Sequence, residues 1–322
     1  MNIILATDDN YVQHCGVTIK SIVTFNKDVV FYLLTEGLAQ DNIRRLEEIA
    51  VINGGSLKIC KVPSEIVKYF PMSKVASDHI SLATYYRLFI TTLLPATVEK
   101  AIYLDCDMII RSSLDDLWCT NIEGRPLGAV YQSLGWSDHN DSWGRLKIPR
   151  EYGYFNAGCI LLNLRYLREI DFQNKAISFI NSNFKSIISH DQDVLNALFY
   201  DLALVLPCKW NYLSLFLNKN LKQKDFPSSC QYISELCASD FEPSIVHFVS
   251  KPKPWDFGCD NPYTKEYYYY LSGTPWAGYK PRFILNDYIK SIVIPVIKNA
   301  IRKIDILHIS DKLYKKRASL GF

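Results

Sequence analysis

Two aspartates, Asp105 and Asp107, are separated by a single residue at the end of an apolar run in this 322-residue chain. The run, Ala101 to Leu104, predicts a buried strand, and side chains two residues apart in a strand point to the same side. Two carboxylates so near to each other repel unless a cation lies between them, and a hard divalent cation is the natural partner. Open α/β sheets bind ligands at the carboxyl ends of their strands. The pair therefore predicts a metal site that holds a phosphate-bearing ligand.

A second cluster closes an apolar run late in the chain, where His247 is followed by a loop that carries Lys253 between two prolines. A neutral imidazole suits a manganese-like ion better than magnesium. A lysine is a compact charge suited to phosphate, and the prolines stiffen the loop that holds it. Taken alone, a histidine at a strand end is more often a hydrogen-bonded structural residue.

Two further motifs carry amides. Phe155-Asn156-Ala157-Gly158 places an amide before small residues, which suits a wall where the backbone approaches a ligand, although taken alone it is better explained as a turn between strands. His190-Asp191-Gln192-Asp193 opens a predicted helix, with Asp191 as the N-cap and Asp193 as a first-turn acid. Helix capping leaves Gln192 unexplained, and its amide can both donate to and accept from a sugar.

The elements that must position these residues alternate between strands and helices. Hydrophobic periodicity predicts strands over 2–7, 29–35 and 56–62 and helices over 11–25 and 40–52. That order is typical of a parallel sheet with right-handed crossovers. Further along we predict helices over 81–93 and 191–199 and strands over 101–110, 127–131, 159–163 and 245–248. The predicted fold class is α/β, a Rossmann-like domain with a mostly parallel central sheet.

Glycine-rich phosphate loops are missing from the sequence. No G-x-G-x-x-G follows the first predicted strand, and no G-x-x-x-x-G-K-[ST] occurs anywhere. Dehydrogenases and P-loop nucleotide hydrolases therefore lose their main support. A diphosphate bound here has to be neutralised another way, which favours the metal.

The composition describes an ordinary globular protein, with 48% hydrophobic and 21% charged residues. The nine cysteines are odd in number and lack the spacing of a zinc site, which favours reduced thiols in a cytoplasmic protein. The N-terminal residues do not resemble a signal peptide, and no apolar stretch is long enough to span a bilayer. We therefore expect a cytoplasmic protein.

The C-terminal part is strongly basic. Residues 276–322 carry ten Lys and Arg against three Asp, whereas the rest of the chain carries 26 basic and 30 acidic side chains. Apolar clusters alternate with the basic residues, and Pro295 favours two short amphipathic helices over one. Such a tail either lies peripherally on an anionic membrane or packs on the catalytic domain or another subunit. Since no recognition motif accompanies the basic residues, we expect no nucleic-acid partner.

Five short motifs occur in the order seen in glycosyltransferase family 8. They are Asp8-Asp9-Asn10-Tyr11, Tyr103-Leu104-Asp105-Cys106-Asp107, Phe155-Asn156-Ala157-Gly158, Asp191-Gln192-Asp193 and His247 with Lys253-Pro254-Trp255. Over about residues 2–280 the chain resembles the bacterial lipopolysaccharide and lipooligosaccharide glucosyl- and galactosyltransferases of that family.

The resemblance implies a GT-A catalytic domain over 1–280, followed by the basic amphipathic tail over 281–322. It implies retaining transfer of glucose or galactose from a UDP-sugar to a saccharide or glycolipid acceptor in cell-surface glycan synthesis. The implied cofactor is Mn²⁺, with Mg²⁺ as the alternative.

The resemblance also implies a role for each matching residue. The metal ligands are Asp105, Asp107 and His247. The uridine contacts are Asp8, Asn10 and Ile80. Lys253 and Arg87 meet the diphosphate and donor sugar, and the sugar site is lined by Asn156, Asp191 and Gln192.

The resemblance places Gln192 on the β-face of the reacting carbon. A neutral amide is a poor nucleophile, which favours an internal-return route over a covalent intermediate. The chain departs from the family at Gln132, where members commonly carry an aspartate near the donor sugar. That change leaves the donor sugar open, because hydroxyl recognition depends on the polar groups that line the pocket.

Other classes of function stay open. A D-x-D at a strand end is also the signature of haloacid-dehalogenase-like phosphatases, although Met108-Ile109-Ile110 does not continue that motif. A nucleotide-sugar-binding protein without turnover is a second alternative. A self-glycosylating primer similar to glycogenin is a third, but most of the 21 tyrosines are expected to be packing residues.

Overall fold

The structure is a computed structural model that describes residues 1–63, 65, 83–249, 251–281, 293–294 and 297. The chain divides into two compact units. The larger contains Met1–Val249 and Glu266–Ala277, and the smaller contains Ser250–Lys265 and Gly278–Phe322. Ile80 and nearly all of the predicted tail over 281–322 lie outside the described residues. The division into a domain over 1–280 and a tail over 281–322 stays a prediction.

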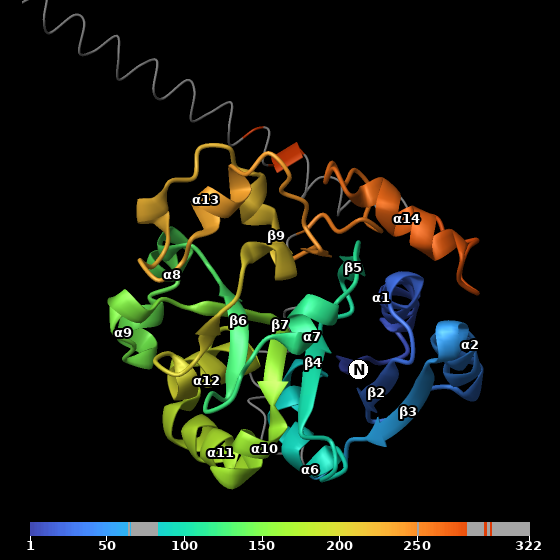
Figure 1. Ribbon diagram of the computed structural model, residues 1–322, viewed down its shortest axis with the longest axis horizontal. Coiled ribbons are helices and arrows are strands. Elements are labelled where there is room, and N and C mark those ends of the chain that lie inside the picture. The colour runs from blue at the N-terminus through green and yellow to red at the C-terminus, as the bar shows by residue number, and fades with distance from the viewer. Residues whose placement is uncertain (64, 66–82, 250, 282–292, 295–296, 298–322) are drawn as a thin grey trace, which may run out of the picture. The chain divides into compact units, whose positions relative to one another are not determined.

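A mostly parallel sheet forms the centre of the larger unit (Figure 1). Seven strands of the described chain pair in the order β3-β2-β1-β4-β7-β6-β8. Their bounds are β1 Asn2–Ala6, β2 Val30–Thr35, β3 Ser56–Lys61, β4 Lys100–Leu104, β6 Leu127–Tyr131, β7 Phe155–Asn163 and β8 Leu204–Val205. All neighbours are parallel except β7, which runs antiparallel to both β4 and β6. The predicted α/β fold with a mostly parallel sheet is confirmed.

Short helices connect these strands. The α-helices are α1 Val12–Phe25, α2 Gln40–Ala50, α5 Ala83–Tyr86, α6 Ile90–Leu93, α7 Asp115–Cys119, α8 Leu134–His139, α9 Ser142–Leu146, α10 Leu164–Glu169, α11 Phe172–Asn183, α12 His190–Phe199, α13 Tyr232–Leu236 and α14 Thr264–Ser272. The 3-10 turns are η1 Ile52–Gly54, η2 Arg87–Phe89, η3 Arg150–Tyr152, η4 Phe184–Ser186, η5 Cys208–Trp210, η6 Ser214–Leu217 and η7 Gln223–Asp225. Within the described ranges, no helix is long and apolar enough to cross a membrane.

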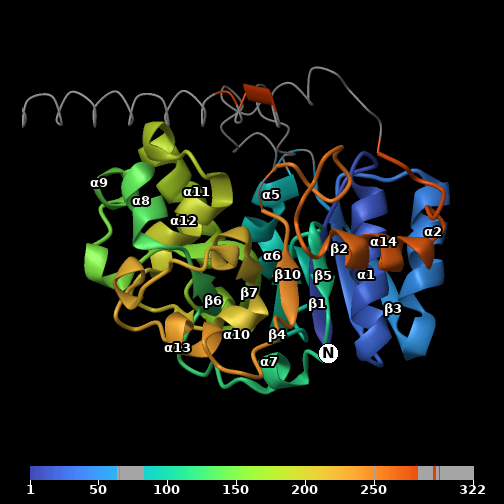
Figure 2. The ribbon, with the colours of Figure 1, turned by 90° about the horizontal axis from the view of Figure 1, so that it is seen from above.

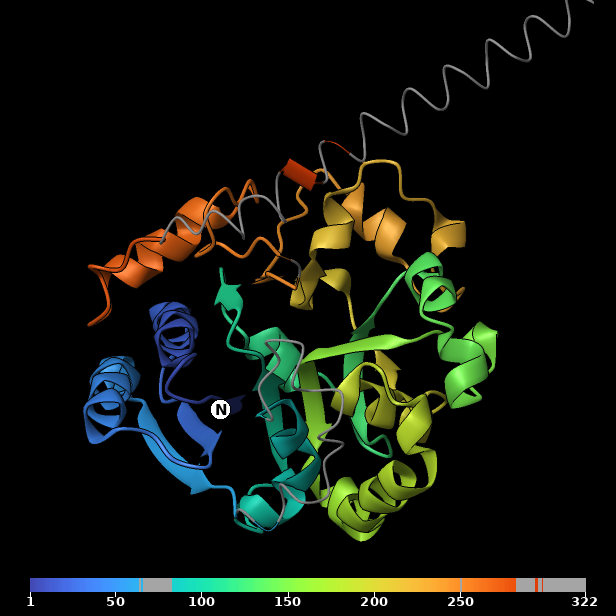
Figure 3. The same ribbon diagram turned by 180° about the vertical axis from the view of Figure 1, so that it is seen from behind.

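Two pairs of helices pack against different parts of the sheet. Helices α1 and α2 pack together and α2 contacts β3, while α11 and α12 pack together and α12 contacts β7 (Figures 1 and 3). The strands between them are almost fully buried, as the central residues Ile3, Leu33, Ile102 and Leu161 illustrate. A sheet buried on both faces gives a rigid base for the loops at its carboxyl edge.

The prediction of one continuous strand over 101–110 is wrong. This segment divides into β4, which ends at Leu104, and β5, Met108–Ile110, with residues 105–107 as a bend between them. The hydroxyl of Thr18 on α1 holds this bend, because it lies 3.0 Å from the Cys106 carbonyl oxygen and 2.9 Å from that of Met108. The bend moves the chain out of the main sheet.

Strand β5 enters a second sheet, which has three strands in the described chain, in the order β5-β10-β9. Strand β10 is Ile245–His247 and β9 is Tyr212–Leu213. Viewed from above, β5 and β10 lie side by side (Figure 2), and their antiparallel register pairs Met108 with His247. The small sheet therefore carries the histidine to the bend.

Two further predictions need correction. The helix over 81–93 is broken in its described part into α5, η2 and α6, because Phe89, at φ −112° and ψ 8°, leaves helical geometry. The strand over 159–163 begins earlier, at Phe155, so Asn156-Ala157-Gly158 belong to β7 and not to a turn. The extra strand residues bring this motif beside the end of β4, since the Asp105 amide donates to the Gly158 carbonyl over 2.8 Å.

Candidate active site

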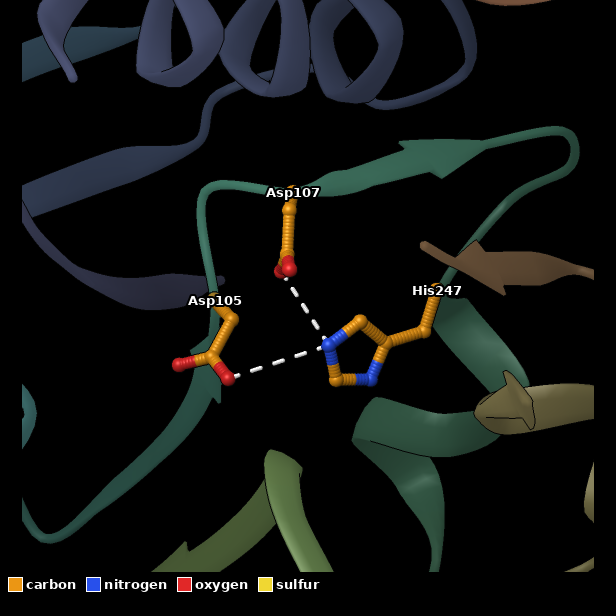
Figure 4. A group of neighbouring side chains, drawn as sticks. All are labelled: Asp105, Asp107 and His247. Carbon is orange, nitrogen blue, oxygen red and sulfur yellow. Dashed lines mark ion pairs between the residues drawn. The ribbon is translucent and has the colours of Figure 1, made fainter. Parts of the chain in front are cut away.

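Asp105, Asp107 and His247 meet where the two sheets approach each other (Figure 4). One ligand atom from each lies within 4.8 Å of the others. The Nε2 atom of His247 is 3.1 Å from Asp107 Oδ1 and 3.8 Å from Asp105 Oδ2. Metal–ligand bonds of about 2.0–2.3 Å place two ligands of one ion roughly 3–4.5 Å apart. Two carboxylates and an imidazole at this spacing fit a divalent cation.

A buried amide sets the orientation of the histidine. The Nδ1 atom of His247 lies 2.9 Å from Asn211 Oδ1, which can only accept a hydrogen bond. The proton of the neutral ring is therefore on Nδ1, which leaves the Nε2 lone pair directed at the two aspartates. Asn211 in turn donates to Asn156 Oδ1 over 2.8 Å. Asn211 is not predictable from the sequence, because nothing in the local sequence distinguishes it and its contacts span 36 and 55 residues.

Gly158 lets these groups come together. A Cβ atom there would lie 2.2 Å from His247 Cε1 and 2.8 Å from Asp105 Oδ2, far inside contact distance. The small residue was expected where backbone approaches a ligand. In the structure it makes room for the metal-binding side chains themselves.

Arg87 connects the metal cluster to α12. Its guanidinium is buried, lying 2.7 Å from Asp105 Oδ1 through Nη2 and 2.7 Å from Asp191 Oδ2 through Nε. It also donates to the Ala157 carbonyl and stacks over the Tyr103 ring at 4.0 Å. These contacts are with the protein, so the predicted contact of Arg87 with diphosphate or sugar stays a prediction.

Asp191 is not the helix cap that the sequence suggested. Helix α12 begins at His190 with Ser189 as its N-cap residue, and Asp191 lies buried in the first turn against Arg87. Burial raises the pKa of Asp191 to about 7, although Arg87 acts in the opposite direction. A buried carboxyl with so perturbed a pKa is characteristic of functional sites.

Gln192 and Asn156 are neighbours across α12 and β7. Gln192 Oε1 accepts from Asn156 Nδ2 over 3.2 Å and from the Ala157 amide over 2.9 Å. The structure thus brings together the three residues predicted for the sugar site, Asn156, Asp191 and Gln192, beside the metal cluster.

The residues predicted for the uridine and for sugar selection lie at the same edge of the sheet. Asp8 and Asn10 follow β1, whose end is level with the bend, since Cys106 Sγ lies 3.2 Å from the Ala6 carbonyl oxygen. Asp8 Oδ1 accepts from the Asn10 amide over 2.9 Å, which shapes this turn. Gln132 follows β6 and is buried, and its backbone amide donates to the Tyr154 carbonyl over 2.8 Å.

Two predicted residues cannot be placed at this edge. Ile80 lies outside the described residues. Lys253 belongs to the smaller unit, where its backbone amide donates to Asp256 Oδ2 over 2.7 Å. Their roles stay predictions.

A mostly parallel sheet with an Asp-Cys-Asp bend and a distant histidine at its carboxyl edge defines the GT-A class of sugar transferases. The chain belongs to glycosyltransferase family 8, since the model described as Glycosyl transferase family 8 matches residues 2–259. The predicted family is confirmed, and the protein is a glycosyltransferase.

Proteins of similar sequence and a solved structure of similar fold support this family assignment. The chain is 30% identical over 282 residues to "General stress protein A" of Bacillus subtilis (strain 168), covering 86% of this chain and 94% of that protein. It is 26% identical over 285 residues to the "Lipopolysaccharide 1,2-glucosyltransferase" of Escherichia coli (strain K12), covering 88% and 80%. The crystal structure of the galactosyltransferase LgtC with donor and acceptor sugar analogs shares the fold, with TM-score 0.73 and 22% identity over 91% of this chain and 100% of that one. These matches support the predicted enzyme class, hexosyltransferase.

Proposed function

We propose that this protein transfers glucose or galactose from a UDP-sugar to a saccharide or glycolipid acceptor, with retention of configuration, during synthesis of lipopolysaccharide or another cell-surface glycan. The observation that carries the proposal is the Asp105, Asp107 and His247 cluster at the carboxyl edge of the sheet. The relatives named as lipopolysaccharide glycosyltransferases support the choice of sugar and acceptor class.

The proposed cofactor is Mn²⁺, with Mg²⁺ as the alternative, and Asp105, Asp107 and His247 would hold it. An imidazole in the ligand set favours Mn²⁺. When bound, the ion would stabilise the negative charge that develops on the departing UDP.

The other proposed roles rest on the resemblance to the family and, for Asp8, Asn10, Gln132, Asn156, Asp191 and Gln192, also on position at this edge. Asp8 and Asn10 would bind the uridine with Ile80, and Lys253 and Arg87 would meet the diphosphate and donor sugar. Asn156, Asp191 and Gln192 line the donor-sugar site, and Gln132 contributes to the choice of sugar.

We favour an internal-return route. In it the bond from the sugar carbon to the phosphate oxygen breaks, the acceptor hydroxyl bonds to the same face of that carbon, and its proton passes to the departing phosphate. The nearby carboxyl of Asp191 is held against Arg87 at 2.7 Å, and the amide of Gln192 is a poor nucleophile.

A panel of UDP-sugars with Mn²⁺, scored by thermal shift and by hydrolysis to UDP, tests this function. By mass action, the donor that binds most tightly should raise the melting temperature most, and we expect that donor to be UDP-glucose or UDP-galactose. Stabilisation without hydrolysis or transfer would support a binding protein without turnover. Release of phosphate from sugar phosphates without an acceptor would support a phosphatase, which the family match makes the weaker alternative.

We also propose that the basic segment over 281–322 contacts an anionic membrane, which suits a lipid-linked acceptor. The proposal rests on the sequence, where the Lys and Arg of residues 276–322 outnumber the Asp by ten to three. Truncation after Lys280 should lower sedimentation with anionic vesicles while sparing donor hydrolysis. Equal sedimentation of the full and truncated chains would favour a tail that packs on protein.

A further inference from the structure

A buried ion pair lies behind Gln192, and the chemistry proposed above does not use it. Arg145 on α9 meets Asp193 on α12, with 2.6 Å from Nη1 to Oδ2 and 3.2 Å from Nη2 to Oδ1. The Asp193 side chain is 0% exposed and that of Arg145 is 10% exposed. Such a two-pronged, desolvated pair is costly to assemble unless its geometry is well satisfied.

Asp193 is well satisfied, and this fixes the direction of the next hydrogen bond. Its Oδ2 also accepts from the backbone amides of Ile188 and Ser189, over 2.7 and 2.8 Å. The hydroxyl of Tyr154, a buried residue just before β7, lies 2.7 Å from Asp193 Oδ1. A carboxylate facing a guanidinium can only accept, so the Tyr154 hydroxyl donates its proton to Asp193. Burial and Asp193 raise the pKa of Tyr154 well above its ordinary value, which keeps that proton in place.

Because the Tyr154 hydroxyl donates its proton to Asp193, its oxygen is left to accept a hydrogen bond from Gln192. The Nε2 atom of Gln192 lies 3.2 Å from the Tyr154 hydroxyl oxygen. At the other end of the amide, Oε1 faces two N–H donors, the Ala157 backbone and the Asn156 side chain. A flipped amide would place N–H against N–H at Ala157 and oxygen against oxygen at Tyr154. One orientation of the Gln192 amide is therefore selected at both ends.

This orientation determines what Gln192 offers to a ligand. Two donors occupy the lone pairs of Oε1, and Tyr154 takes one of the two Nε2 hydrogens. Within the described residues, the second Nε2 hydrogen is the group left for a sugar oxygen. An oxygen already bound by two donors is a still weaker nucleophile, which strengthens the case against a covalent intermediate on this residue.

We propose that Arg145, Asp193 and Tyr154 are positioning residues that lock the Gln192 amide so that it presents an N–H, not its oxygen, to an oxygen of the donor sugar. The inference rests on the proposed function for the identity of the ligand. It also gives a role to residues 134–146, which contain α8 and α9 and reach α12 through Arg145.

The test compares Tyr154→Phe with the unchanged protein and with Tyr232→Phe. Tyr232 is an equally buried tyrosine whose hydroxyl accepts from the Tyr131 backbone amide over 2.8 Å and contacts neither Gln192 nor the metal cluster. Loss of an acceptor for a buried donor is expected to lower kcat about 10-fold in Tyr154→Phe. The KM for the UDP-sugar and the affinity for UDP with Mn²⁺ should change less than about twofold, because the uridine and metal contacts stay intact. Tyr232→Phe should keep kcat.

Arg145→Met and Arg145→Lys extend the test to the far end of the chain of contacts. We expect Arg145→Met to lower kcat as Tyr154→Phe does, and Arg145→Lys to recover part of the loss, since lysine keeps the charge but not the two-pronged geometry. An unchanged kcat in Tyr154→Phe, or an equal loss in Tyr232→Phe, would overturn the proposal.

A second readout does not depend on turnover. In protein labelled with ¹⁵N-glutamine, the side-chain amide signal of Gln192, assigned with Gln192→Leu, should exchange one hydrogen slowly in the unchanged protein and both quickly in Tyr154→Phe. An identical signal in both proteins overturns the proposed lock. If the unchanged protein shows this signal but neither hydrolyses nor transfers any UDP-sugar, the proposed function fails while the lock stands.

Discussion

Asp107→Asn is expected to abolish sugar transfer and metal-dependent binding of UDP. The substitution keeps the size of the side chain but removes one of the two carboxylate charges in the Asp105, Asp107 and His247 cluster. An amide oxygen is a weaker ligand for a hard cation, and the ion is expected to contribute several kcal/mol to stabilising the leaving UDP. We expect turnover to fall by about 10²-fold or more, with little loss of fold stability. Isothermal titration of UDP in the presence of Mn²⁺, together with donor hydrolysis, measures both effects.

Asp105→Asn should have the same effect on turnover, with a further cost. Asp105 also accepts a partly buried hydrogen bond from Arg87 over 2.7 Å, so loss of the Asp105 charge weakens the support of that guanidinium. Asp41→Asn is a matched control, because Asp41 on α2 pairs with Arg44 at the surface. Full activity in EDTA, or in either cluster variant, would contradict a role for the metal.

The sequence predicted the metal cluster for a reason that holds only in part. Strand alternation was expected to place Asp105 and Asp107 on one side, but the residues form a bend between two sheets. Their side chains converge because Thr18, about 90 residues earlier, bonds the carbonyls on both sides of Asp107. A single hydroxyl at that distance leaves no local pattern. The order of motifs predicted the family, whereas local periodicity could not predict the bend.

The residues that support the site could not be predicted from the sequence either. Asn211, Tyr154 and Arg145 act through hydrogen bonds that span 36, 38 and 48 residues. Each is an ordinary residue type whose importance comes from tertiary contacts alone. Hydrophobic periodicity predicts where strands and helices run, but it does not show how α9, α12 and β7 pack together.

Gly158→Ala is expected to weaken metal binding strongly while it leaves most of the fold intact. The added methyl would lie 2.2 Å from His247 Cε1. The backbone of Gly158 cannot retreat easily, because its carbonyl accepts from the Asp105 amide over 2.8 Å within paired strands. The imidazole must therefore move, against its hydrogen bond to Asn211. We expect affinity for UDP with Mn²⁺ to fall about 10–100-fold, as when the support of a metal ligand is lost.

The control for this substitution is Gly37→Ala, where an added methyl meets nothing within 4 Å. Overpacking at Gly158 should lower the free energy of unfolding by about 1–3 kcal/mol in EDTA, and Gly37→Ala should change it little. The decisive comparison is made with and without Mn²⁺ and UDP. A Gly158→Ala protein that gains the same stabilisation from them as the unchanged protein would show that His247 is not held where the structure places it. Loss of that gain alone would mean that the glycine serves the metal ligands more than the fold, since the two effects then separate in one protein.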